Sequence, residues 1–107
     1  METFKINLYG TDYEVSLVKS AYMNNDNLYI GLKGTEGEPF ADLTVNISTL
    51  PENQAAVDTN NCPWAEDFII ENRLGSNTGI RLKSGYCSYP VYEFDLNKIN
   101  NIAKILH

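Results

Sequence analysis

The amino-acid sequence predicts an α+β domain, with an antiparallel sheet of about four to six strands and two helices near residues 62–74 and 95–106. Apolar residues alternate with polar residues in four runs of the first half, which is the period of a half-buried strand. Two later segments begin with helix-capping residues and then carry apolar residues at helical spacing. The length of 107 residues suits one domain, so we predict a single domain over residues 1–107.

The first two alternating runs predict a hairpin. Phe4, Ile6 and Leu8 share one face of residues 3–9, and residues 13–18 repeat the pattern after a short link that contains Gly10. Two further runs, at 28–32 and 43–47, extend this hairpin to a meander of four strands. The polar, irregular segment 48–61 is predicted to be a loop.

The first helix is predicted from its ends. Asn61 or Cys62 suits the N-cap, and Pro63 suits the first turn, because its missing N–H has no partner inside the helix there. Gly75 suits the left-handed position just after the helix.

The second helix has the clearer signals. Asp95 is a good N-cap, and Phe94 and Ile99 have the spacing of a hydrophobic staple. Lys104 would lie in the final turn, where a cation interacts favourably with the helix dipole. One apolar stripe follows the predicted helix and consists of Leu96, Ile99, Ile102, Ala103 and Leu106.

The segment between the two helices is less regular. Residues 76–83 predict a short strand because Ile80 and Leu82 alternate with polar residues. Residues 86–94 are rich in aromatic residues and look extended. Because Pro90 has no N–H to donate to a ladder, we expect an edge strand or a broken strand here.

The charge balance argues against two kinds of partner. The chain has 14 acidic and 8 basic residues, for a formal net charge of −6. The basic residues are scattered along the chain, whereas proteins that bind nucleic acids or anionic membranes gather them into patches. Neither a signal peptide nor a membrane-spanning run is recognisable, so we expect a cytoplasmic protein that binds neither nucleic acid nor membrane.

Few residues could carry catalysis. The only histidine is the terminal His107, and Cys62 and Cys87 are the only cysteines. This set contains neither an ordinary catalytic triad nor a closed zinc site, so we expect no catalytic residues, no metal and no cofactor. The cysteines could be reduced and buried, or joined in a disulfide; a reactive thiol at Cys62, near a helix start, is a third, less favoured alternative.

Two segments are candidates for binding. The first is an aromatic extended segment, and its predicted partner-binding residues are Tyr86, Tyr89, Tyr92 and Glu93, since tyrosine is common in protein interfaces. The second is the polar stretch around the only tryptophan, and its predicted ligand-binding residues are Asp58, Asn60, Asn61 and Trp64. The alternative interpretations are that these residues pack the edge of the core and cap the helix.

The same two segments carry a resemblance to a known family. Residues 57–68 (VDTNNCPWAEDF) and 84–96 (SGYCSYPVYEFDL), together with 4–10 and 38–46, resemble small uncharacterised proteins with a domain of unknown function. Such proteins occur on conjugative and other mobile elements of Gram-positive gut bacteria. The resemblance brings no catalytic residues, but it implies a setting in which small acidic proteins block host defence by binding a nuclease or restriction enzyme.

These observations rank three hypotheses. The first is a non-enzymatic, protein-binding accessory factor, acting as an inhibitor of a host defence complex and encoded on a mobile element. The second is a domain that binds a small molecule or peptide at the Asn/Trp helix start. The third is a thiol-dependent enzyme at Cys62.

Overall fold

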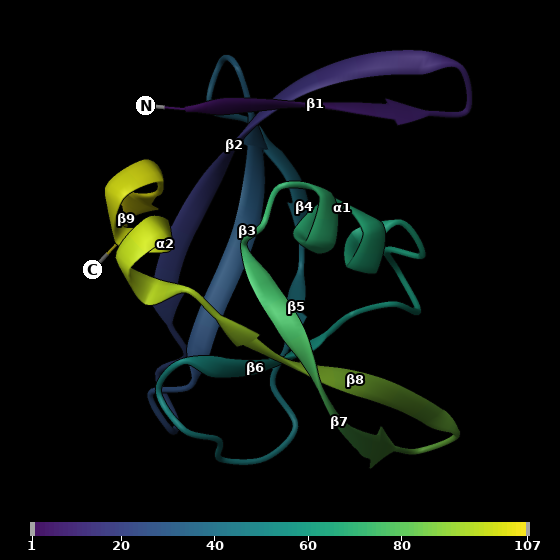
Figure 1. Ribbon diagram of the computed structural model, residues 1–107, viewed down its shortest axis with the longest axis vertical. Helices are drawn as coiled ribbons and strands as arrows, with labels where there is room; N and C mark the ends of the chain where they lie inside the picture. The colour runs from purple at the N-terminus through teal and green to yellow at the C-terminus, as the bar shows by residue number, and fades with distance from the viewer. Residues whose placement is uncertain (1, 107) are drawn as a thin grey trace.

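The computed structural model describes residues 2–106 and confirms the α+β fold class. Within these residues, two sheets are joined by short connections, and two short helices lie against them (Figure 1). The elements in chain order are β1 (Thr3–Leu8), β2 (Thr11–Ala21), β3 (Leu28–Gly34), β4 (Pro39–Asp42), β5 (Thr44–Val45), β6 (Gln54–Val57), α1 (Ala65–Glu71), β7 (Gly75–Ser84), β8 (Cys87–Phe94), α2 (Leu96–Ile102) and β9 (Lys104–Ile105).

The first sheet has the strand order β1-β2-β3-β4, with β9 added alongside β2. The predicted hairpin is confirmed, because β1 and β2 pair antiparallel from Thr3↔Ser16 to Leu8↔Thr11. The long strand β2 pairs with β3 over Val15–Ala21, so β1 and β9 follow one another along its other edge.

The predicted fourth strand of the meander is displaced. The strand that pairs with β3 is Pro39–Asp42, whereas residues 43–47 were expected there. After Leu43 the chain enters the second sheet, where only Thr44 and Val45 form β5. An alternating run of apolar residues indicates which face of a strand is buried, but it does not indicate which sheet the strand joins.

The second sheet has the order β5-β6-β8-β7. Strand β6 lies in the segment that we predicted to be a loop. Its residues Ala55, Ala56 and Val57 are buried, but a run this short does not distinguish a strand from other buried structure.

The expectation for Pro90 was wrong, because β8 is a central strand that pairs with both β6 and β7. The register of β7 shifts between Asn77 and Arg81, next to the position that pairs with Pro90. At this irregularity the Thr78 hydroxyl donates to the Val91 carbonyl at 2.8 Å. The missing N–H therefore falls beside a bulge, which is one of the positions where a sheet tolerates proline.

Helix α1 is shorter than predicted. It begins at Ala65 with Trp64 at the N-cap position, so neither Asn61 nor Cys62 caps it. After the helix it is Arg73 that takes the left-handed backbone, with φ 55°. Gly75 has a different role: a Cβ there would lie 2.5 Å from the Glu93 carbonyl oxygen, so the glycine allows β7 and β8 to approach each other.

Helix α2 is capped as predicted, since Asp95 Oδ1 accepts a hydrogen bond from the Lys98 N–H at 3.1 Å. The helix ends at Ile102, however, and Lys104 lies in β9 where we had predicted the last helical turn. Pairing with β2 gives this segment backbone partners that a frayed helix end would lack; Leu106 N–H donates to the Lys19 carbonyl at 2.8 Å.

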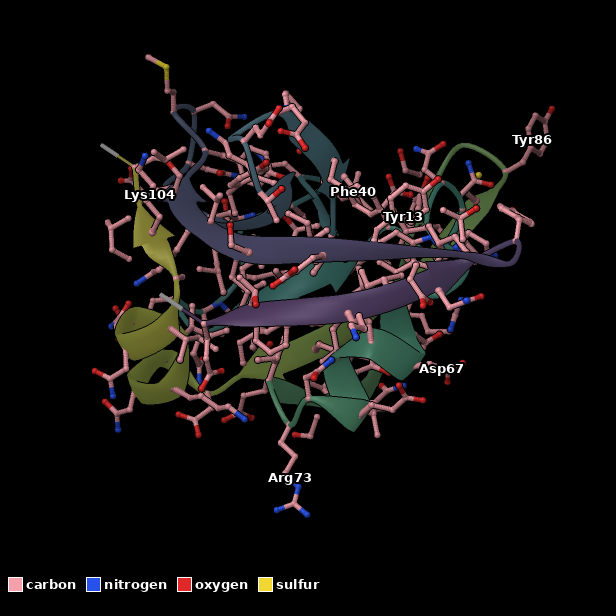
Figure 2. All side chains as sticks on the ribbon, turned by 90° about the horizontal axis from the view of Figure 1, so that it is seen from above. Tyr13, Phe40, Asp67, Arg73, Tyr86 and Lys104 are labelled. Carbon is pink, nitrogen blue, oxygen red and sulfur yellow. The ribbon has the colours of Figure 1, made fainter. Side chains whose placement is uncertain are left out.

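The core combines both sheets and both helices. Strands of the first sheet contribute Leu17 and Ile30, the second sheet contributes Tyr92, and the helices contribute Ile69 and Ile99, all of them fully buried. This core leaves the turn ends of the β1–β2 and β7–β8 hairpins outside, and both hairpins extend toward the same side of the molecule (Figures 1 and 2).

Candidate functional site

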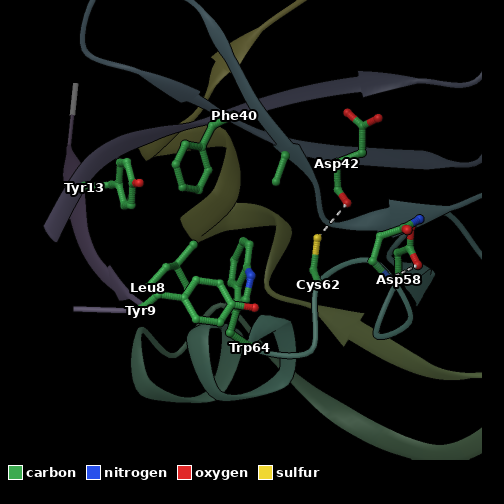
Figure 3. A pocket seen from close by; sticks show the side chains of 10 residues that line it. Leu8, Tyr9, Tyr13, Phe40, Asp42, Asp58, Cys62 and Trp64 are labelled. Carbon is green, nitrogen blue, oxygen red and sulfur yellow. Dashed lines mark hydrogen bonds between the residues drawn. The ribbon is translucent and has the colours of Figure 1, made fainter. Parts of the chain in front are cut away.

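A cavity of about 500 Å³ opens beside the β1–β2 hairpin. Its wall is built from that hairpin, from β4, and from the loop that connects β6 to α1 (Figure 3). We call it the aromatic pocket; the residues that line it are Leu8, Tyr9, Tyr13, Phe40, Ala41, Asp42, Asp58, Asn61, Cys62 and Trp64.

Aromatic rings form one part of this pocket. The ring centroids of Tyr13 and Phe40 are 5.3 Å apart, and those of Phe40 and Trp64 are 6.2 Å apart. Trp64 also packs edge-on against the buried Phe68, which fixes this part of the wall to the core. The Tyr13 side chain keeps 41% of its surface exposed, so the aromatic wall is accessible from solvent.

Polar groups form the other end of the pocket. Asp58 is buried, and its carboxylate accepts hydrogen bonds from the Asn61 backbone N–H at 3.2 Å and from Asn61 Nδ2 at 2.8 Å. The Cys62 thiol donates to the backbone carbonyl of Asp42 at 3.6 Å (Figure 3). The residues that line the pocket include two carboxylates and no lysine or arginine.

The Cys62 thiol is poorly suited to nucleophilic chemistry. Burial raises its pKa above the ordinary value, and the nearby charges of Asp58 and Asp42 raise it further. A reactive cysteine needs the opposite, a lowered pKa that yields the thiolate near neutral pH. Both cysteines are free, and this environment argues against the thiol-dependent enzyme.

Tyr9 stands at the rim of the pocket in an uncommon backbone conformation. The pair Leu8↔Thr11 leaves a two-residue turn, in which Tyr9 and Gly10 have φ values of 53° and 83°. Positive φ at both positions is typical of a type I′ turn, which favours asparagine at the position of Tyr9. A tyrosine there costs about 1 kcal/mol, yet its side chain is 99% exposed and gains no packing in return.

The predicted ligand-binding residues largely come together. Asp58, Asn61 and Trp64 all line the aromatic pocket, whereas Asn60 is exposed and does not line it. Tyr9, Tyr13 and Phe40 also line the pocket, although they were not predicted as site residues. The one local signal was a tyrosine in a Tyr-Gly turn, where Asn-Gly is the common choice.

The predicted partner-binding residues are separated by the fold. Tyr92 is fully buried and Tyr89 is 8% exposed, so neither ring is presented to a partner. Glu93 is exposed and accepts a hydrogen bond from Asn53 Nδ2 at 3.1 Å. Only Tyr86 among the three tyrosines is fully exposed, at the tip of the β7–β8 hairpin (Figure 2).

The turn at Tyr86, like the turn at Tyr9, carries a fully exposed tyrosine side chain. Ser84 pairs with Cys87, so Gly85 and Tyr86 form a two-residue turn, with Gly85 at φ 63°. A glycine with positive φ at the first turn position is typical of a type II′ turn. Each long hairpin therefore ends in a tyrosine that projects into solvent.

The residues that the structure describes were also compared with the requirements of a metal site and of a membrane-spanning helix. Residues 2–106 contain no group of three or more metal-ligating side chains that could hold an ion. Neither of the two helices found there is long and apolar enough to cross a membrane. The terminal His107, noted above as the only histidine, lies outside the described residues.

Fold and site together define a small two-sheet α+β domain with an acidic aromatic pocket beside a hairpin turn. The chain belongs to the family called domain of unknown function DUF4313, whose model matches residues 16–104. This agrees with the resemblance to domain-of-unknown-function proteins, and no enzyme family is indicated. Comparison with curated proteins and with solved structures finds no match.

Proposed function

We propose that this protein is a non-enzymatic, protein-binding domain that holds its partner against one face of the molecule. We call it the binding face and define it by Tyr9, Tyr13, Phe40, Trp64 and Tyr86. The observation that carries the proposal is the presentation of Tyr9 at the rim of an aromatic pocket, fully exposed and in a strained backbone. The backbone strain at Tyr9 is not offset by any packing of its ring in the free protein. Contact between this ring and a bound partner would offset it.

The residue types of the binding face suit a protein partner. Tyrosine and tryptophan give a large contact area at a low cost in conformational entropy, and they are enriched among the residues that dominate interface energies. The two hairpins that carry Tyr9 and Tyr86 extend toward the same side (Figures 1 and 2), so one partner could contact both turns.

The pocket chemistry supports binding more than bond-making. Cys62 is held as a thiol, and the carboxylate of Asp58 is engaged by Asn61. Neither group has the activated neighbour that general acid–base or nucleophilic catalysis requires. The resemblance to proteins of mobile elements extends this proposal to the partner. We propose that the protein is encoded on a mobile element, and that in the cytoplasm it binds and inhibits a host defence complex.

A comparison of three variants tests the binding face. Tagged parent protein, Tyr9→Ala, Tyr86→Ala and the control Met23→Ala would each be used to capture partners from the native host. Captured proteins would be quantified by mass spectrometry. Met23 is a matched control because its side chain is as exposed as the two tyrosines but lies in the loop between β2 and β3.

The expected result is a partner that the parent and Met23→Ala retain and that both tyrosine variants lose. Circular dichroism would establish that all four proteins are folded. A partner retained by every variant would place the interface elsewhere. Equal loss with Met23→Ala would show that the capture depends on exposed apolar side chains in general and would reject the binding face.

A further inference from the structure

The lining of the aromatic pocket has three properties that bear on the ligand it can take. One part of its wall is aromatic, its other end has Asp42 and Asp58, and its lining has no lysine or arginine. An anionic ligand would be repelled by the two aspartates and would find no basic side chain in such a pocket, whereas a cation would be attracted to them.

The three rings form one aromatic wall, because each ring packs against the next. Tyr13, Phe40 and Trp64 follow one another with centroid separations of 5.3 and 6.2 Å. The face of an aromatic ring carries negative potential, and a cation within about 6 Å of a ring centroid is attracted to it, most strongly by tryptophan. Lysine and arginine also have apolar stems that cover aromatic surface while the charged head reaches a polar environment.

The carboxylates give this end of the pocket its negative potential. Asp58 is buried and is kept in place by two hydrogen bonds from Asn61. Asp42 Oδ1 accepts a hydrogen bond from the Tyr29 hydroxyl at 2.5 Å. Burial raises the pKa of the Cys62 thiol in the pocket wall, and the negative charges of Asp58 and Asp42 raise it further.

We infer that the aromatic pocket takes a positively charged side chain, a lysine or arginine of the partner protein. The stem of this side chain lies against Tyr13, Phe40 and Trp64, and its charge is directed toward the end that holds Asp42 and Asp58. The inference rests on the proposed function, since it assigns the chemistry of the partner residue that enters the binding face. The net charge of −6 favours the approach of a basic partner surface.

The test uses small probes that represent the side chain alone. The Nα-acetyl amides of lysine, arginine and norleucine would be titrated at millimolar concentration into ¹⁵N-labelled protein. Norleucine has the stem of lysine without the ammonium group. Trp64 is the only tryptophan, so its indole N–H gives a single, assigned signal in the pocket wall.

The lysine and arginine probes are expected to shift the Trp64 indole signal, with norleucine at least about fivefold weaker. The shift should shrink as salt is added, because exposed charges are screened. Asp42→Asn and Asp58→Asn should each weaken the lysine probe about threefold. Asp26→Asn, the same substitution at an exposed aspartate outside the pocket, should leave binding unchanged.

Several outcomes would overturn the inference. Equal binding of norleucine and lysine would show an apolar pocket and leave the proposed function standing, since the hairpin variants decide that separately. No shift with either cationic probe would reject the pocket as a cation site. Equal weakening by Asp26→Asn would mean that only the net charge matters. Asp42 is exposed, so Asp42→Asn keeps the test decisive if Asp58→Asn fails to fold.

Discussion

The hydroxyl of Tyr92 donates a hydrogen bond to the carboxylate of Glu66 at 2.6 Å and thereby joins β8 to α1. The ring of Tyr92 is fully buried, and burial together with the carboxylate raises the pKa of its hydroxyl. This contact explains why a tyrosine in an aromatic segment belongs to the core: its polar end has a partner inside the protein.

Removing this hydroxyl should destabilise the fold. Tyr92→Phe is expected to lower the free energy of unfolding by about 1–2 kcal/mol, the usual value for a hydrogen bond to a charged group that is partly exposed. Urea denaturation measures the effect. Tyr86→Phe, at a fully exposed position, is the control and should change stability little. Similar values for the two variants would contradict a special role for the Tyr92–Glu66 contact.

The Cys62 thiol should make the protein sensitive to alkaline pH. Its pKa lies above the ordinary value of 9.0 in the folded state. Below that value both states carry the proton, and the thiol makes no pH-dependent contribution. As the pH rises through it, the unfolded chain loses the proton first, and the folded state loses stability.

Replacing Cys62 should remove the part of the pH dependence of stability that its thiol causes. Between about pH 8 and pH 9.5, the urea midpoint of Cys62→Ala should fall less steeply than that of the parent, although the variant starts lower because it leaves a small cavity. Cys87→Ala, at a half-buried thiol, is the control. Parallel curves for Cys62→Ala and the parent would show that Cys62 ionises alike in both states.

A buried asparagine should be among the most sensitive polar positions. Asn27 donates to Asn46 Oδ1 at 2.9 Å and to the Ser48 carbonyl at 2.7 Å, and accepts from the Leu50 N–H at 3.0 Å. Asn27→Ala removes all three contacts and should cost about 2–4 kcal/mol of unfolding free energy. It should also speed hydrogen exchange at the Leu50 amide.

Asn24 provides the comparison for this network. It is exposed and contributes one contact, accepting from Asn46 Nδ2 at 2.9 Å. Asn24→Ala should cost less than about 1 kcal/mol. If Asn27→Ala were no more damaging than Asn24→Ala, the network would not stabilise the segment between β5 and β6.

Tyr9 should trade stability for binding. Tyr9→Asn places the preferred residue in the type I′ turn and should raise the free energy of unfolding by about 0.5–1 kcal/mol. The same substitution should weaken partner binding, because the ring is lost from the binding face. Tyr9→Ala also removes the ring but keeps a poor turn residue, so it should weaken binding without this gain in stability. A stabilised Tyr9→Asn that binds as the parent does would show that the ring is dispensable.

Much of the local structure could be predicted from the sequence. The alternation of Phe4, Ile6 and Leu8 indicated a strand with one apolar face, and the Asp95 cap located the start of α2. Three of the four residues assigned to the Asn/Trp helix start line the aromatic pocket. These features depend on residues close together in the chain, where steric and hydrogen-bonding preferences act directly.

Other features depend on contacts between residues that are far apart in the sequence, and these could not be predicted from local patterns. The apolar pattern of α2 continues to Leu106, yet Lys104 and Ile105 pair with β2, because that edge of β2 was free beyond β1. Tyr13, Phe40 and Trp64 come from three separate elements, and only the packing of the hairpin, β4 and the loop before α1 brings their rings together.

The sequence by itself thus determined the fold class, the acidic charge and the faces of the strands. The tertiary structure alone decided which aromatic residues are buried and which are presented. Tyr86 and Tyr92 lie six positions apart in one segment, and the first is fully exposed while the second is fully buried. The physical reason is that burial depends on what packs against a strand: sheet and helix cover Tyr92, whereas the turn carries Tyr86 beyond them.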